Sequence, residues 1–125
     1  MSDPYFREYR AGDYINIHTD VVRQRQNVRR RLCFNYWTPS PGWDSAWGGS
    51  FVWCGGFVKR PGGGGAFPAA FRAPTRYNQV GMFVPSEDSR HFVDRVSDAA
   101  DPSHHRFSFT SWLEDTTPPP GSEEL

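Results

Sequence analysis

Glycine and proline interrupt this chain so often that long helices have little room. The 125 residues include 12 Gly and 11 Pro, and 16% of all residues are aromatic. Short runs of aromatic and β-branched residues lie between these breaks, and such runs favour strands over helices. The composition therefore predicts an all-β fold with little helix.

Turn-forming residues divide the chain into about seven or eight expected strands. This number of short strands is typical of a sandwich or a barrel. The clearest of them cover residues 4–9, 14–20, 31–37, 49–54, 79–84, 90–96 and 105–113.

The remaining segments are predicted from their composition to be irregular. Residues 21–30 are basic and are expected to be a loop or a frayed turn. Residues 55–66 are rich in Gly and predict a mobile loop or a flexible lid. Residues 114–125 combine acidic side chains with three consecutive prolines, which predicts a disordered tail behind a single folded domain at residues 1–113.

Charge and cysteine content exclude several classes of protein. The chain carries 14 Lys and Arg against 14 Asp and Glu, and a neutral chain lacks the basic excess of a general nucleic-acid binder. It contains no run of 18 apolar residues, so no membrane span is predicted. With only Cys33 and Cys54, and no secretory signal at the N-terminus, we expect a cytoplasmic protein without a disulfide framework.

His18, Thr19 and Asp20 form a candidate metal-binding motif at the end of an expected strand. Residues two apart in a strand share a face, so His18 and Asp20 can reach one ion. Two imidazoles and one carboxylate would leave open positions on Fe(II). The pattern alone is weak, because a strand histidine more often has a structural or surface role.

The third ligand has several candidates. His91 lies on a later expected strand and is preferred. His104 and His105 are rivals, although His105 adjoins Arg106 in the same expected strand and would point to its opposite face.

Arg106 lies on the last expected strand and shares a face with Ser108 and Thr110. A buried guanidinium cannot lose its proton and needs an anionic partner. Its planar fork suits a carboxylate from outside the chain, and Ser108 can add a hydroxyl hydrogen bond.

These motifs, taken in order, resemble the Fe(II)/2-oxoglutarate-dependent oxygenases, and most closely their prolyl 4-hydroxylase-like branch. The resemblance covers residues 5–113. It is carried by residues 9–14 leading into His18-Thr19-Asp20, then residues 31–36, 48–51, 78–85 and 91–96, and finally Arg106-Phe107-Ser108.

The resemblance implies a double-stranded β-helix, a barrel of the jelly-roll or cupin type. It implies that His18, Asp20 and His91 bind Fe(II), and that O2 is a co-reactant. It implies further that Arg106 and Ser108 bind 2-oxoglutarate, with Tyr36 and Tyr9 in contact with it. Hydroxylation is favoured over halogenation, because the halogenating relatives lack the carboxylate ligand that Asp20 supplies.

On that fold the alternation of strand residues predicts which side chains face the interior. Asn16 is expected to join His18 and Asp20. Leu32 and Phe34 are expected to join Tyr36, and Val93 and Arg95 to join His91, unless the strand ends before Arg95.

The substrate cannot be read from the motifs. The resemblance suggests a peptidyl proline, an amino acid or a small metabolite. Arg23 and Arg25 follow the His18–Asp20 motif and are substrate-binding candidates, as is Arg95; a solvated basic loop is the plainer interpretation of the first two.

Two other functions stay open at this point. The family's usual N-terminal helices are missing from the chain, which suggests a minimal core, a fragment, or a non-catalytic subunit that depends on an oligomer or a partner chain. The third hypothesis is a cupin-like metal enzyme that does not use 2-oxoglutarate.

Overall fold

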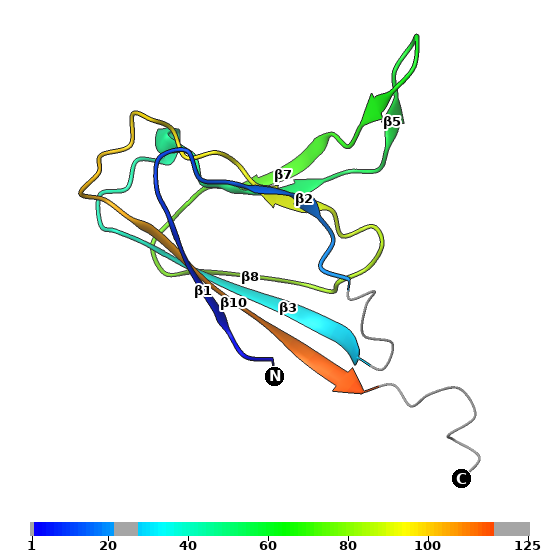
Figure 1. The fold of residues 1–125 in the computed structure, drawn as a ribbon, viewed down its shortest axis with the longest axis horizontal. Coiled ribbons are helices and arrows are strands. Elements are labelled where there is room, and N and C mark those ends of the chain that lie inside the picture. Colours follow the sequence, from blue (N-terminus) through cyan, green and yellow to red (C-terminus); the bar gives the residue numbers. More distant parts are fainter. Residues whose placement is uncertain (1, 22–27, 117–125) are drawn as a thin grey trace.

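Two four-stranded antiparallel sheets form the body of the protein, as a computed structural model that describes residues 2–21 and 28–116 shows (Figure 1). The first sheet has the order β1 (Tyr5–Tyr9), β10 (Arg106–Thr116), β3 (Val28–Pro39) and β8 (Gln79–Phe83). The second has the order β2 (Ile15–His18), β9 (His91–Val93), β4 (Phe51–Cys54) and β7 (Ala69–Ala73).

The chain crosses between the sheets in the order that a double-stranded β-helix requires. β1 belongs to the first sheet, β2 to the second and β3 to the first; β4 and β7 then lie in the second sheet, β8 in the first, β9 in the second and β10 in the first. This arrangement confirms the predicted all-β fold. The described residues contain one short 3-10 helix, η1 (Ser45–Trp47), and no helix long and apolar enough to cross a membrane.

The space between the sheets is closed at one end by a small apolar cluster. Tyr9, Val93, Val96 and Ala100 are buried there, with Ile15, Trp43 and Trp47 packed against them. Backbone hydrogen bonds tie the turn after β1 to the segment after β9: Gly12 N donates to Val96 O (2.8 Å), and Val96 N donates to Asp13 O (2.9 Å). This closed end fixes the distance between the sheets, and the opposite end is left for a site.

The basic segment 21–30 is not a loop throughout. Residues 28–30 begin β3 and pair with the extension of β10, which runs three residues past the expected start of the tail. Arg31 Nε lies 2.7 Å from Asp115 Oδ2, and Arg30 Nε lies 3.6 Å from Glu114 Oε1. Opposite charges on neighbouring strands therefore lengthen both strands. The rest of the expected tail lies outside the described residues.

The prediction that Phe34 and Tyr36 face the interior from β3 is wrong. Cys33, Asn35 and Trp37 are buried, whereas Phe34 and Tyr36 lie on the other face of the sheet. Both faces of this strand carry apolar side chains, so the alternation alone could not tell inside from outside.

Asn16 also departs from its expected orientation. The register of β2 against β9 shifts between Ile15 and His18, so Ile15 packs on the core while Asn16 is exposed. Alternation along a strand holds only where the pairing is regular.

The glycine-rich segment 55–66, expected to be a mobile loop or a lid, contains two short strands that its composition did not predict. β5 (Val58–Lys59) and β6 (Gly65–Ala66) form a hairpin, which projects from the two sheets in Figure 1. Residues 69–73, which lie outside the clearest expected strands, form β7, which pairs with β4. These short strands depend on their partners more than on their own propensity.

Substitution of Gly48 tests the link between η1 and the segment after β9. Its φ is +82°, and an added Cβ would lie 2.4 Å from Arg95 O. We expect Gly48→Ala to lower the free energy of unfolding by about 2–3 kcal/mol. Gly56→Ala is the control, because nothing lies within 4 Å of its added Cβ and its φ is not positive. Urea unfolding measures the free energy of unfolding of both variants. Equal values for the two variants would contradict the expected strain at position 48.

Candidate metal centre

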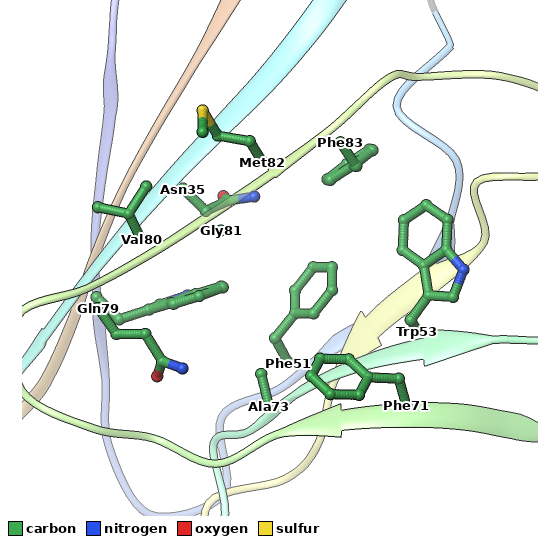
Figure 2. A pocket seen from close by; sticks show the side chains of 11 residues that line it. Asn35, Phe51, Trp53, Phe71, Ala73, Gln79, Val80, Gly81, Met82 and Phe83 are labelled. Atoms are coloured by element: carbon green, nitrogen blue, oxygen red, sulfur yellow. The ribbon is translucent and has the colours of Figure 1, made fainter.

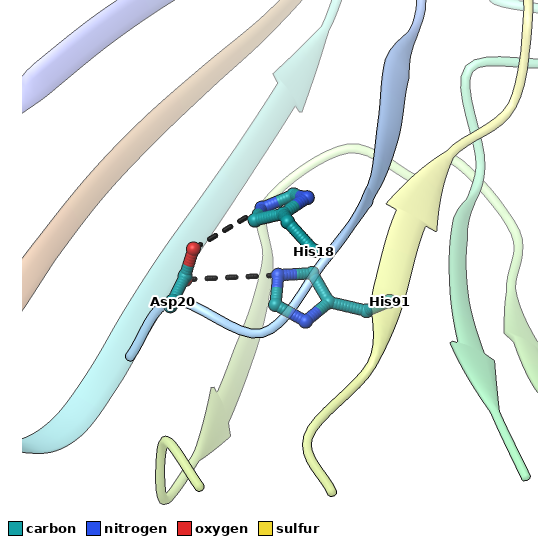
Figure 3. Close-up of side chains that lie close together, drawn as sticks. All are labelled: His18, Asp20 and His91. Atoms are coloured by element: carbon teal, nitrogen blue, oxygen red, sulfur yellow. Dashed lines mark ion pairs between the residues drawn. The ribbon is translucent and has the colours of Figure 1, made fainter. Parts of the chain in front are cut away.

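His18, Asp20 and His91 come together at the open end of the two sheets (Figure 3). Their ligand atoms all lie within 4.8 Å of one another. His18 Nε2 is 3.1 Å from Asp20 Oδ1, and His91 Nε2 is 3.6 Å from Asp20 Oδ2. The backbone pairing of β2 with β9 sets His18 directly opposite His91. The motif and the preferred third ligand therefore converge as the sequence predicted.

Hydrogen bonds to the backbone orient both imidazoles for metal binding. His18 Nδ1 lies 2.6 Å from Asn16 O, and His91 Nδ1 lies 2.7 Å from Ser89 O. A carbonyl oxygen only accepts, so Nδ1 carries the proton in each ring. In the neutral rings Nε2 keeps its lone pair, and both Nε2 atoms face the carboxylate. Such outer hydrogen bonds fix the tautomer of a metal-binding histidine.

Asp20 reaches the site through an unusual backbone conformation. It lies beyond the end of β2 with φ +68°, the left-handed region that few non-glycine residues adopt. Trp112 Nε1 donates to Asp20 Oδ2 at 3.2 Å, and Cys33 Sγ lies 3.5 Å from the same oxygen. Backbone strain at a site that several contacts hold in place is typical of a functional residue.

Electrostatics keep the carboxylate ionised. Burial alone would raise the pKa of Asp20, but the imidazoles of His18 and His91, which in their protonated form donate to the carboxylate and attract it, outweigh burial and hold the pKa well below its usual range. Burial likewise opposes charge on His18, but the hydrogen bonds to Asp20 and to Asn16 O and the charge of Asp20 together outweigh it, so the pKa of His18 is raised.

Aromatic side chains surround His91 on the side away from Asp20. Its ring centroid lies 4.7 Å from that of Phe83, 5.1 Å from that of Phe51 and 6.0 Å from that of Trp53. His91 is 4% exposed, against about a third for the side chain of His18. The second imidazole is therefore held rigidly, and the first stays open to solvent.

A cavity of about 350 Å³ contains the three candidate ligands. Tyr9, Ser108 and Thr110 also line it, from β1 and β10. Its size falls within the range of small-molecule sites.

Arg106 does not line this cavity itself but lies over the ring of Tyr9, which does. It is 1% exposed, and its Nε and Nη1 have no hydrogen-bond partner among the described residues. Its Cζ lies 4.4 Å from the centre of the Tyr9 ring, and its Cδ would lie 3.0 Å from a Cβ added at Gly49. Burial lowers the pKa of Arg106 to about 10, so it is still cationic at neutral pH. An unpaired buried guanidinium requires an anion.

Two predicted site residues lie away from the cavity. Tyr36 is on the opposite face of β3, where its hydroxyl donates to Asn78 Oδ1 at 2.7 Å, so the structure does not bring it to the cavity. β9 ends at Val93, and Arg95 is exposed with Nη2 3.0 Å from Asp98 Oδ1. A substrate role for Arg95 is therefore not supported. Arg23 and Arg25 lie outside the described residues.

The rival third ligands have other partners. His104 Nδ1 lies 3.3 Å from Asp101 Oδ2, and His105 Nδ1 contacts Glu8 Oε1. Neither belongs to the cluster around Asp20.

Sequence reasoning missed Trp112 and Arg7. Trp112 fixes Asp20, and Arg7 lines the cavity opposite Ser108 in the pairing of β1 with β10. Trp112 continues the two-residue spacing of Arg106, Ser108 and Thr110, so extending that pattern would have found it. Arg7 lies on a strand whose pairing with β10 was not predicted.

Comparison with known families agrees with this geometry. The family model described as the 2OG-Fe(II) oxygenase superfamily matches residues 4–114. The chain belongs to this superfamily. No curated protein matches the sequence closely enough to count as a relative. In the name of the family, 2OG denotes 2-oxoglutarate. Members of the family in general use Fe(II), 2-oxoglutarate and O2.

The site fits those groups. Two neutral imidazoles and an ionised carboxylate are the donor set that non-haem Fe(II) takes, with positions left open. The unpaired Nε and Nη1 of Arg106 fit the carboxylate of 2-oxoglutarate.

Removal of one ligand tests the metal centre directly. We expect His18→Ala and Asp20→Ala each to weaken Zn²⁺ binding by more than about 100-fold, because even the loss of an outer hydrogen bond costs 10–100-fold. Calorimetry with Zn²⁺ as a stand-in for Fe(II) measures the affinity. His104→Ala is the control and should bind as the wild type does. Unchanged affinity in Asp20→Ala would contradict the assignment.

Proposed function

We propose that this oxygenase is an Fe(II)- and 2-oxoglutarate-dependent hydroxylase of an unactivated C–H bond. The proposed substrates are an amino acid, a peptidyl proline or a small metabolite. The observation that carries the proposal is the buried guanidinium of Arg106, whose Nε and Nη1 have no partner among the described residues, on the same strand as Ser108 and Thr110, which line the cavity of the three ligands. A metal centre alone would not need such buried, unbonded N–H donors on this strand.

Each group has a place among the residues of the chain. His18, Asp20 and His91 would hold Fe(II), and Arg106 would bind the far carboxylate of 2-oxoglutarate with help from Ser108 and Tyr9. When bound, Fe(II) couples the decarboxylation of 2-oxoglutarate by O2, which gives succinate and CO2, to insertion of an oxygen atom into the substrate.

The protein contributes position and shielding. The hydrogen bonds from His18 and His91 to backbone carbonyls present Nε2 to the ion, and Trp112 holds the carboxylate of Asp20 in place. The apolar wall around His91 keeps water from that side of the centre.

The resemblance to the prolyl 4-hydroxylase-like branch supports hydroxylation as the outcome. Asp20 supplies the carboxylate that the halogenating relatives lack. We also propose a cytoplasmic location, which the two free buried cysteines, Cys33 and Cys54, support.

A partner-dependent core is the second candidate function. The outer face of the first sheet exposes Phe6 (66%), Met82 (61%) and Val80 (47%), which favours a second copy or a partner chain over this face. Light scattering combined with turnover tests it, since a stable monomer that converts 2-oxoglutarate would exclude this candidate.

The proposed reaction is tested by succinate formation in air with Fe(II) and 2-oxoglutarate. Amino acids, proline-containing peptides and small metabolites are screened for stimulation, with His18→Ala as the control. We expect succinate to form with wild type only, and at least one compound to stimulate it and gain an oxygen atom. Metal-bound, folded protein that forms no succinate under any condition would contradict the proposal.

Replacement of Arg106 separates this proposal from a cupin-like metal enzyme that does not use 2-oxoglutarate. A charge-assisted hydrogen bond contributes about 1.5–3 kcal/mol, so Arg106→Gln should weaken binding of 2-oxoglutarate to the Zn²⁺-loaded protein by roughly 10- to 150-fold. Arg106→Lys keeps the charge without the planar fork, so its affinity for 2-oxoglutarate should lie between those of the wild type and Arg106→Gln. Arg10→Gln, which removes an exposed arginine paired with Glu8, is the control. Equal affinity in all four proteins would favour the cupin-like alternative.

A further inference from the structure

A second cavity lies at the free edges of the two sheets, between β7 and β8 (Figure 2). Its volume is about 400 Å³. An apolar cavity of about 150 Å³ is enough to bind benzene, so this one has room for a larger ring system. Its lining residues are Asn35, Trp37, Phe51, Trp53, Phe71, Ala73, Gln79, Val80, Gly81, Met82 and Phe83.

This edge cavity adjoins the metal centre. Asn35, Trp37 and Phe51 line both cavities. Two of the other lining residues, Trp53 and Phe83, pack with Phe51 around the ring of His91. A molecule in the edge cavity therefore lies against the same side chains that hold a metal ligand.

The lining has the chemistry of a ring-binding site. None of the eleven described residues that line the cavity carries a charge, and five of them are Trp or Phe. Phe71, at its mouth, is 62% exposed. A flat apolar side chain that stays exposed beside a cavity marks a place where an apolar group binds.

One polar atom in the lining lacks a partner. Gln79 Oε1 is buried and receives no hydrogen bond from any described residue. Figure 2 shows the Gln79 amide directed across the cavity towards Ala73. The other amide, that of Asn35, is already bonded: Oδ1 accepts from Thr110 Oγ1 (2.7 Å), and Nδ2 donates to Cys33 Sγ (3.4 Å). A buried acceptor without a donor favours a ligand that brings one.

Gly81 keeps the cavity's inner wall in place. A Cβ added there would lie 2.5 Å from Trp37 Cη2, so only glycine lets the indole lie flat against β8. Trp37 thus forms the partition between the edge cavity and the metal-centre cavity, both of which it lines.

We propose that the edge cavity binds an aromatic ring of the substrate, and that this ring carries an N–H or O–H group that donates to Gln79 Oε1. The inference rests on the proposed hydroxylase function, since the ring would hold the rest of the substrate beside Asp20 and His91. It narrows the substrate class to ring-bearing amino acids or metabolites, away from acidic molecules.

Indole and benzofuran test the proposal as a matched pair of probes. The two have nearly the same shape, but only indole has an N–H donor. Calorimetry measures their binding to the full chain loaded with Zn²⁺ and 2-oxoglutarate. We expect indole to bind about threefold to tenfold more tightly than benzofuran, and Gln79→Met to abolish this difference.

The variant Phe71→Ala should weaken indole binding by about threefold to tenfold through the loss of an aromatic contact. Phe6→Ala is its control, because Phe6 is equally exposed but lies on the outer face of the other sheet. Both variants should bind 2-oxoglutarate as the wild type does, which shows that the metal centre is intact.

Three results would overturn the proposal: no indole binding by wild type that binds 2-oxoglutarate, equal binding of indole and benzofuran, or equal indole affinity in the wild type and Phe71→Ala. Failure of the proposed function gives a different result. There the wild type would bind indole but not 2-oxoglutarate, and the cavity would hold rings without being a substrate site.

Discussion

The carboxylate of Asp20 between two imidazoles is the interaction on which the rest of the site depends. It requires β2 and β9 to pair so that His18 and His91 lie opposite each other, and it requires Asp20 to turn inward with a left-handed backbone. Trp112, from the other sheet, completes the arrangement by donating to that carboxylate. The site is thus made where the two sheets meet, and neither sheet could form it alone.

Arg106 is the residue proposed to bind the carboxylate of the cosubstrate that lies away from the metal. Its guanidinium is buried on β10, and Nε and Nη1 have no hydrogen-bond partner among the described residues, which is costly unless an anion joins it. The metal ligands and the guanidinium together define a molecule with a chelating end and a distant carboxylate. On the other side of Phe51 and Trp37 lies the edge cavity, which has no charge among its described lining residues. Under our proposals the polar cosubstrate binds in the metal-centre cavity and the ring of the substrate in the edge cavity, and both cavities are lined by Asn35, Trp37 and Phe51.

The candidate site residues were predictable from the sequence to the extent that their spacing follows the strand period. His18, Asp20, His91, Arg106 and Ser108 were chosen this way together with a family resemblance. Tyr36 does not lie on the expected inner face, because both faces of β3 are apolar and only the contacts of the whole sheet decide which face turns inward. Arg95 is exposed because β9 ends at Val93, an alternative that the sequence left open. Trp112 could have been found by extending the same spacing along β10, whereas the place of Arg7 depends on the pairing of β1 with the distant β10, which local patterns do not encode.

An anaerobic titration tests the central claim, that the three ligands and Arg106 form one site for Fe(II) and 2-oxoglutarate. Fe(II) is added to the protein first and 2-oxoglutarate second, and the visible charge-transfer band of the chelate is recorded. The account predicts a band that saturates at one equivalent of each, that is missing in His18→Ala, and that needs more 2-oxoglutarate in Arg106→Gln. Folded wild-type protein that binds Fe(II) but develops no band with 2-oxoglutarate would contradict it.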